Sequence, residues 1–499
     1  MPISNTRPVN TILVVSLLGF GIASRTALYF WNRSLWLDEA MLALNVTHRT
    51  YAELLQPLDY NQRAPFGFLL LERLAVDVFG NSEWSLRFFP FFCGLVSLAL
   101  FSRLALRVLP SAVALFALSL FVVSPTLIYY SAEAKQYSSD VIVALVLYTI
   151  AISELPQRLS WTRALVLAVV GLAALFLSHP AFFVLAGLGS LWAISAIHVR
   201  DWKGLALLAS CGLVWFMLFG MLSYRELSRS PILIEYWEQR HGFIPVPPSS
   251  FTEARQLFET FLAVFENPLG FAFPGFAAFL FLAGTIDMFT RDRKLFFIIL
   301  SPIPFVLLAS ALHMYPFSER LLLFMVPCLL IGIAEGINVF RTQLLVPSLC
   351  AVALAMLLAK PLATTKDFIS GRYTVEEVRP ALWHATTQWR SGDLIYVYHS
   401  TIPAFLYYAN DFGFKPADYV LGGEDSGVLP DAGAVRSNSR VWVLLSHAKG
   451  TRVVERTRIR EYFNGIGREV IKSEYTDDWH PFGGVWLWLF DLTERNKLP

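Results

Sequence analysis

The strongest constraint on the fold is a series of long apolar segments that runs from the N-terminus to about residue 360. A helix needs roughly 20 mostly apolar residues to cross a bilayer. The composition agrees with many such spans, because 55% of the residues are hydrophobic, 16% are charged and the mean hydropathy is +0.52. We predict a polytopic α-helical membrane protein with about eleven spans, near 10–31, 86–108, 111–129, 139–153, 161–178, 181–198, 204–223, 266–286, 295–312, 319–338 and 343–360.

Charge and cysteine content exclude several classes of function. The net charge of +2 is small and dispersed, whereas a nucleic-acid partner would need a basic face. All four cysteines lie inside apolar runs and lack metal-ligand spacing, so we expect neither a disulfide nor a cysteine-based zinc site. The first apolar run has no convincing cleavage site and resumes after Arg25, which indicates a retained signal-anchor span, with Arg25 reaching outward to the membrane surface.

Basic residues in the short loops predict the orientation of the chain. If the N-terminus is cytoplasmic, every short inner turn carries arginine or lysine, namely Arg103, Arg107, Arg158, Arg163, Arg200, Lys203, Arg291, Arg293, Lys294 and Arg341. The outer side then receives two long loops, 32–85 and 224–265, and everything after residue 360. Within these loops, 65–79 and 254–265 carry apolar residues at helical spacing, so we predict helices that lie in the membrane interface.

The composition becomes typical of a soluble domain from about residue 361. Three apolar runs are too short for helices and favour strands: 393–399, 440–447 and 484–490. Helical patterns alternate with them, at 375–390, 401–412 and 451–463. We therefore predict a transmembrane domain over 1–360 and a small extracytoplasmic α/β domain over 361–499. No glycine-rich phosphate loop follows any of these strands, so we assign this domain no nucleotide.

The sequence LWLDEAM (35–41) places two adjacent carboxylates, Asp38 and Glu39, just outside the first span. Ionisable groups at the ends of spans are costly and indicate function. Other such groups lie in separate outer loops, and we expect them to face one outer cavity: Asn61, Gln62, Arg63, Glu133, Lys135, His179, His313, Tyr315, Glu319 and Arg320.

This combination of groups suits group transfer from a phosphate-linked lipid. A carboxylate can take the proton of an acceptor hydroxyl. Cations can stabilise the negative charge that develops on a departing phosphate. A divalent metal held by carboxylate oxygens could share that task, and the sequence leaves metal dependence open.

Several motifs together resemble a known family. They are SLWLDEAMLAL (34–44), NQRAPFGFLLLERL (61–74), GNSEWSLRFFP (80–90), YYSAEAKQYSSD (129–140) and YPFSERLLLFMVP (315–327). In order and spacing they resemble the GT-C glycosyltransferases of the dolichyl-phosphate-mannose protein mannosyltransferase type, glycosyltransferase family 39, and their bacterial aminoarabinose-transferase relatives. The resemblance covers most of the chain up to about residue 340.

The resemblance implies roles for individual residues. Asp38 would be the catalytic base, and Glu39 would orient the acceptor or a metal. Arg63 would contact the lipid phosphate, and we add Lys135, Arg320 and Tyr315 to that group. We expect Gln62, Glu133 and His313 to contact the substrate.

The sequence also departs from the mannosyltransferase pattern. That pattern has His-Pro-Pro where this chain has Arg63-Ala64-Pro65, which puts mannose in doubt as the sugar. The C-terminal domain does not resemble the β-trefoil of the eukaryotic enzymes. The resemblance therefore implies a bacterial-type enzyme in the inner (plasma) membrane, with its active site on the periplasmic side.

We therefore hypothesise a glycosyltransferase that moves a sugar from a polyprenyl-phosphate carrier to an acceptor glycan, lipid or protein, with inversion at the anomeric carbon. The alternatives are a transporter or flippase for the same lipid-linked sugar, and a non-catalytic assembly subunit. The individual residues also have structural interpretations. Asp38 could cap a helix that starts at Glu39, Arg63 could reach to headgroups, and His313 could be a structural histidine. The sugar, the acceptor and the oligomeric state stay open.

Overall fold

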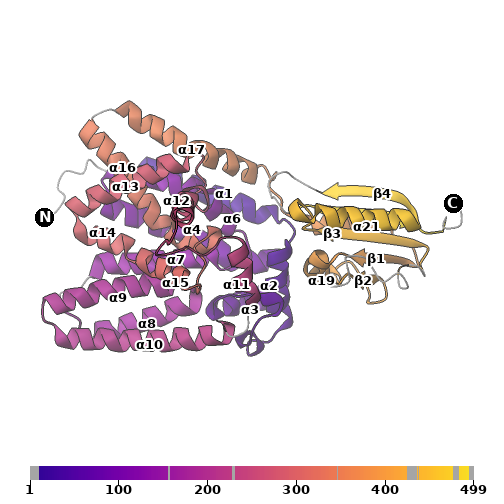
Figure 1. Cartoon of the computed structure of the whole chain (residues 1–499), viewed down its shortest axis with the longest axis horizontal. Coiled ribbons are helices and arrows are strands. Elements are labelled where there is room, and N and C mark those ends of the chain that lie inside the picture. The colour runs from indigo at the N-terminus through magenta and orange to yellow at the C-terminus, as the bar shows by residue number, and fades with distance from the viewer. Residues whose placement is uncertain are drawn as a thin grey trace. The chain divides into compact units, whose positions relative to one another are not determined.

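The computed structural model describes residues 10–154, 158–227, 231–344, 347–423, 435, 438–475 and 483–493. Residues 228–230 of the predicted outer loop and 345–346 of the last predicted span lie outside this part. The chain forms two compact units, which are coloured along the sequence in Figure 1. The membrane unit comprises Met1–Phe30, Tyr51–Gly80 and Trp84–Ile369, and the C-terminal unit comprises Trp31–Thr50, Asn81–Glu83 and Ser370–Pro499.

The membrane unit is almost entirely helical. Its elements are α1 (Thr11–Trp31), η1 (Glu53–Leu55), η2 (Asp59–Asn61), α3 (Phe66–Phe79), α4 (Glu83–Val108), α5 (Ser111–Val123), α6 (Pro125–Tyr130), α7 (Tyr137–Glu154), α8 (Trp161–Leu177), α9 (Ala181–His198), α10 (Trp202–Leu227), α11 (Pro231–Gln239), α12 (Phe251–Glu266), α13 (Pro274–Arg291), α14 (Arg293–Leu300), α15 (Pro302–Ala311), η3 (Glu319–Met325), α16 (Val326–Val339), η4 (Phe340–Leu344) and α17 (Pro347–Ile369).

These helices make the chain a multi-pass membrane protein. Among the described residues, six helical segments are long and apolar enough to cross a bilayer: Thr11–Trp31, Glu83–Val108, Ala181–His198, Trp202–Leu222, Arg293–Ala311 and Glu319–Thr342. Three shorter apolar helices, Ser111–Val123, Tyr137–Ser153 and Trp161–Leu177, coincide with further predicted spans. The total of eleven spans stays a prediction.

Prolines account for several differences between the predicted spans and the helices. The predicted span 111–129 is divided at Ser124, because Pro125 begins α6. The span predicted at 295–312 is likewise divided, with Pro302 as the first residue of α15. Proline lacks an N–H and therefore suits a first helical turn better than a helix interior. The predicted span 266–286 is helical only from Pro274, since α12 ends at Glu266.

The outward-reaching position expected for Arg25 is wrong. Its side chain is 1% exposed. Its Nη1 donates to the carbonyl oxygens of Gly21, at 3.1 Å, and Val122, at 3.3 Å. Backbone carbonyls of α1 and α5 therefore satisfy part of the guanidinium inside the helix bundle, which offsets the cost of burying it.

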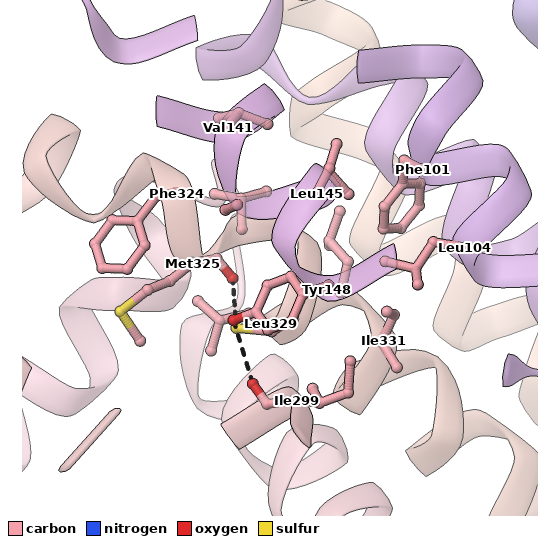
Figure 2. Close-up of a cluster of buried hydrophobic side chains, with 14 of the residues drawn as sticks. Phe101, Leu104, Val141, Leu145, Tyr148, Ile299, Phe324, Met325, Leu329 and Ile331 are labelled. Carbon is pink, nitrogen blue, oxygen red and sulfur yellow. Dashed lines mark hydrogen bonds between the residues drawn. The ribbon is translucent and has the colours of Figure 1, made fainter. Parts of the chain in front are cut away.

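A large apolar core joins the helices of the membrane unit. Figure 2 shows part of it, where side chains of α4, α7, α14 and α16 meet. Tyr148 of α7 is completely buried there, and its hydroxyl donates to the carbonyl oxygen of Ile299 at 3.4 Å. This contact gives the buried phenol a partner, as burial in an apolar core requires.

The C-terminal unit is built on a five-stranded mixed sheet in the order β2-β1-β3-β5-β4. The strands are β1 (Asp393–Val397), β2 (Tyr419–Leu421), β3 (Arg440–Ser446), β4 (Arg468–Tyr475) and β5 (Val485–Asp491). Strand β1 runs parallel to β2 and β3, whereas β5 runs antiparallel to β3 and β4. The helices are α2 (Leu37–His48), α18 (Val378–Thr387), α19 (Ile402–Tyr408) and α21 (Val453–Ile466), with short turns η5 (His399–Thr401) and η6 (Gly450–Arg452).

Helices cover both faces of this sheet. On one face, Ile459 and Phe463 of α21 join a buried cluster with Tyr396, Trp488 and Phe490. On the other face, α18 contacts β3 and β5, and its His384 ring lies 6.4 Å from the ring of Trp442. Burial on both faces explains why the central strands appear in the sequence as short, continuous apolar runs.

Helix α2, at residues 37–48, packs against α19 and so belongs to the C-terminal unit. The sequence had placed these residues in an outer loop (32–85) of the transmembrane domain. The division predicted at residue 360 also differs from the observed units, because α17 continues to Ile369. The segment with the two adjacent carboxylates therefore packs against a helix that lies far from it in sequence.

Candidate active site

Asp38 and Glu39 lie in the first turn of α2. The helix begins at Leu37, so Asp38 is inside it and is not the cap that the structural interpretation assumed. Negative charge near a helix N-terminus is stabilised by the helix dipole. Asp38 is half-buried, whereas Glu39 is completely buried. Of the two carboxylates, Asp38 is the one that keeps exposed surface.

Glu39 has a cationic partner. Its Oε2 lies 3.9 Å from Nη2 of Arg33, and the two side chains are 0% and 1% exposed. A buried carboxylate requires such a partner, because an isolated charge in a low-dielectric interior is very unfavourable. The predicted role of Glu39 in orienting an acceptor or a metal stays a prediction beside this observed ion pair.

The predicted phosphate-binding cations lie in segments that contact one another within the membrane unit. Lys135 Nζ donates to Gln62 Oε1 at 2.5 Å. Gln136 Nε2 donates to the main-chain oxygen of Arg63 at 3.5 Å. The guanidinium of Arg320 lies 5.6 Å from the ring centroid of Tyr137. The turn at 133–137 therefore joins the segments that carry all three cations.

The burial of these residues differs. Lys135 is 4% exposed and Glu133, on the same turn, is completely buried. Arg63, Gln62 and Arg320 are half-buried. Burial of charged groups in a membrane protein is costly, so these buried residues support a functional interpretation.

Tyr315 and His313 have partners that account for their positions. The Tyr315 hydroxyl donates to the main-chain oxygen of Leu321 at 2.8 Å. Burial raises the pKa of the Tyr315 phenol above its ordinary value. His313 is exposed, its Nδ1 lies 2.9 Å from Glu238 Oε1, and its ring stacks on Phe243 at 4.6 Å. Their contacts with substrate stay predictions.

The carboxylate pair belongs to the C-terminal unit and the cations belong to the membrane unit. The single outer cavity that the sequence suggested stays a prediction. A cavity of about 390 Å³ is present elsewhere in the membrane unit. It is lined by residues of α7, α8, α9 and α10 and of the loops between them, and it includes Arg158 and Arg163, which we assigned to the inner side. None of the predicted site residues lines this cavity.

Among the described residues, no group of three or more histidine, cysteine, aspartate or glutamate side chains is placed to hold a metal ion. A metal centre built from three such ligands therefore does not fit these residues.

Two residues that the sequence did not single out contact the start of α2. Arg33 pairs with Glu39, and Glu376 accepts a hydrogen bond from the main-chain N–H of Leu37 at 3.0 Å. Arg33 lies close enough in sequence to be considered as a partner for the carboxylate pair. No sequence pattern connects Glu376 to a helix that begins 339 residues earlier in the chain.

Comparison with known proteins adds two findings. Residues 63–224 match the family model described as dolichyl-phosphate-mannose-protein mannosyltransferase. This range includes Arg63, Glu133 and Lys135, begins after Asp38 and ends before Arg320. No curated protein matches the sequence.

The solved structures that resemble this chain include ArnT from Cupriavidus metallidurans. The apo form has a TM-score of 0.52 at 12% identity, and the form bound to undecaprenyl phosphate has a TM-score of 0.50 at 13% identity. Each alignment covers 96% of this chain and 97% of ArnT. The apo oligosaccharyltransferase of Archaeoglobus fulgidus has a TM-score of 0.49 at 11% identity, with 95% of this chain and 76% of that chain covered. The chain thus shares the fold of ArnT over nearly its whole length and the sequence pattern of the mannosyltransferase family over residues 63–224, which confirms the predicted resemblance to GT-C glycosyltransferases.

Proposed function

We propose that this chain is a membrane glycosyltransferase that moves a sugar from a polyprenyl-phosphate carrier to an acceptor on the outer face of the membrane. The observation that carries this proposal is the match of residues 63–224 to the mannosyltransferase family model. The ArnT fold supports a lipid-linked donor, because one of the matching ArnT structures is bound to undecaprenyl phosphate.

In the proposed reaction, Asp38 accepts the proton of an acceptor hydroxyl or amine as that group attacks the anomeric carbon of the sugar. A bond forms between the acceptor and the anomeric carbon, and the bond from that carbon to the phosphate oxygen breaks. The electron pair leaves with the polyprenyl phosphate. Arg63, Lys135 and Arg320 stabilise the negative charge on this leaving group.

Direct displacement assisted by one base inverts the anomeric configuration. Purified protein supplied with a polyprenyl-phosphate sugar and an outer-face lipid or glycan extract is therefore expected to form a new glycoside whose anomeric configuration is opposite to that of the donor. Mass spectrometry detects the product and NMR assigns the configuration. A transporter or flippase forms no glycosidic bond in this assay, and retention of configuration would contradict the displacement mechanism.

The proposed phosphate contacts predict a selective effect on donor binding. Each of the changes Arg63→Gln, Lys135→Gln and Arg320→Gln is expected to raise KM for the lipid donor about tenfold, since a hydrogen bond to a charged group contributes about 1.5–3 kcal/mol. Steady-state kinetics at several donor concentrations measures this shift. Lys203→Gln, at a cation assigned to the inner side, is the matched control. Unchanged KM values in all three variants would remove these residues from the phosphate site.

A further inference from the structure

Helix α2 begins without a cap of its own. Its N-cap residue is Trp36, which has an extended backbone (φ −82°, ψ 171°) and makes no side-chain capping bond. The first N–H groups of a helix have no acceptor within the helix, and serine, threonine, aspartate or asparagine usually supplies one. The indole of Trp36 has no oxygen that could accept such a bond.

Glu376 of the C-terminal segment supplies the missing acceptor. Its Oε2 accepts the Leu37 N–H at 3.0 Å, and its side chain is completely buried. Its other oxygen, Oε1, lies 2.7 Å from Nδ1 of His447, the residue that follows β3. One buried carboxylate therefore connects the first residue of α2 to the end of a central strand, and its charge is favoured at the helix N-terminus.

Residues that precede Leu37 also form hydrogen bonds with the C-terminal segment. The Ser34 hydroxyl donates to Glu377 Oε2 at 2.9 Å, and the Leu35 N–H donates to the Tyr408 hydroxyl at 2.8 Å. The Arg379 N–H donates to the Ser34 hydroxyl oxygen at 3.2 Å. Side chains and backbone of residues 376–408 therefore determine the path of the chain up to the residue before Asp38.

We infer that the C-terminal unit positions Asp38 for catalysis and that Glu376 is the positioning residue, acting through the Leu37 N–H. This inference rests on the proposed function, in which Asp38 is the base. Asp38 directly follows Leu37, so fraying of the first turn of α2 moves the Asp38 carboxylate relative to the acceptor. Displacement of a reacting group by about 1 Å can reduce a rate about a hundredfold.

The first test replaces the carboxylate. Glu376→Ala is expected to lower kcat between about 10-fold and 100-fold, with KM for the lipid donor unchanged. Glu376→Gln is expected to restore most of the rate, because its amide oxygen can still accept the Leu37 N–H. Glu455→Ala is the control, since Glu455 likewise contacts a histidine of the same unit, His399, and its other partner is the hydroxyl of Tyr398.

The second test removes the donor. Leu37 is the first residue of α2, a position that tolerates proline, and Trp36 already has the extended backbone that a following proline prefers. Leu37→Pro therefore deletes the N–H and keeps the helix start. The kcat losses of Leu37→Pro and Glu376→Ala are expected to be non-additive in the double variant, because both remove the same hydrogen bond.

A structural readout accompanies the kinetics. Hydrogen exchange of the peptide containing residues 35–42 is expected to accelerate in Glu376→Ala and to stay unchanged in Glu455→Ala. Kinetics of Glu376→Ala equal to those of Glu455→Ala, or additive losses in the double variant, would overturn the inference. If Glu376→Ala does not fold, Leu37→Pro decides the inference: its kcat is expected to fall between about 10-fold and 100-fold, and kinetics equal to those of Glu455→Ala would overturn the inference. Absence of transfer by the unmodified protein would instead overturn the proposed function, and an active Asp38→Asn variant would overturn the role of Asp38 as base, so these failures are distinguishable from a failure of the role of Glu376.

Discussion

Asp38→Asn is expected to lower the rate of sugar transfer at least a hundredfold and to leave the folded protein intact. The amide cannot accept the acceptor's proton, and a positioned general base typically contributes about 10²–10⁴ in rate. Asparagine matches aspartate in size. At this half-buried position in the first turn of α2, the substitution removes a favourable interaction with the helix dipole, which contributes about 0.3–1 kcal/mol.

The measurement is transfer by purified protein, with donor binding and thermal stability followed in parallel. Asp77→Asn is the matched control, because Asp77 lies on α3 in the same predicted outer loop and its carboxylate contacts Arg73 and Tyr51 at the protein surface. We expect this control to transfer sugar at the normal rate. Normal transfer by Asp38→Asn would show that Asp38 is not the base. Absence of transfer by the unmodified protein would instead favour the transporter and assembly-subunit alternatives.

The two adjacent carboxylates differ in their surroundings, because Glu39 has a buried cationic partner. Glu39 faces Arg33 in the interior of the C-terminal unit, whereas Asp38 keeps exposed surface. A general base must reach the proton that it removes, which requires access to the substrate. The structure therefore favours Asp38 over Glu39 as the base, and it gives Glu39 a partner within the protein.

The sequence predicted the parts of the fold that depend on continuous apolar runs. Strands β1, β3 and β5 have such runs because they are buried along most of their length. The long apolar helices have them because a helix that crosses a bilayer needs a continuous apolar surface. Strand β4 was missed because its residues alternate between exposed and half-buried, and its apolar pair Val470-Ile471 stands between the charged residues Glu469 and Lys472. Strand β2 has only three residues, too few for a pattern.

The candidate site could be predicted only as a set of residues. Motif order predicted Asp38, Arg63, Lys135 and Arg320 as site residues, which stays a prediction. The contacts of the 133–137 turn bring together the segments that carry the three cations. Sequence could not assign α2 to the C-terminal unit, because the Leu37–Glu376 bond joins residues that are 339 positions apart. Such a long-range contact produces no local periodicity.

The second large effect is expected where α13 and α16 pack through glycine. Gly332 and Gly336 are four residues apart on α16, a spacing that allows two membrane helices to approach closely. A Cβ at Gly336 would lie 2.0 Å from the main-chain oxygen of Leu280, and a Cβ at Gly284 would lie 2.0 Å from that of Gly332. Because the atoms in the way are backbone, a side chain cannot be accommodated by a change of rotamer.

The same two helices also share a buried ion pair. Arg291 of α13 hydrogen-bonds Glu335 of α16, whose side chain is completely buried and also accepts from Asn338 Nδ2 at 3.1 Å. Separation of the helices to admit a methyl group at position 336 would strain this pair. A buried carboxylate that loses its cation is strongly destabilising.

Gly336→Ala is therefore expected to destabilise the membrane unit by about 3 kcal/mol or more, with most of the extracted protein aggregated. Size-exclusion chromatography and a thermal melt in detergent measure the loss. Gly212→Ala is the matched control, because Gly212 lies inside α10 with no atom within 4 Å of its added Cβ. There alanine is expected to be neutral or to stabilise the helix by up to about 1 kcal/mol. Equal stability of Gly336→Ala and Gly212→Ala would show that α13 and α16 do not pack as closely as the structure places them. The cost of a methyl group at position 336 depends on that close packing.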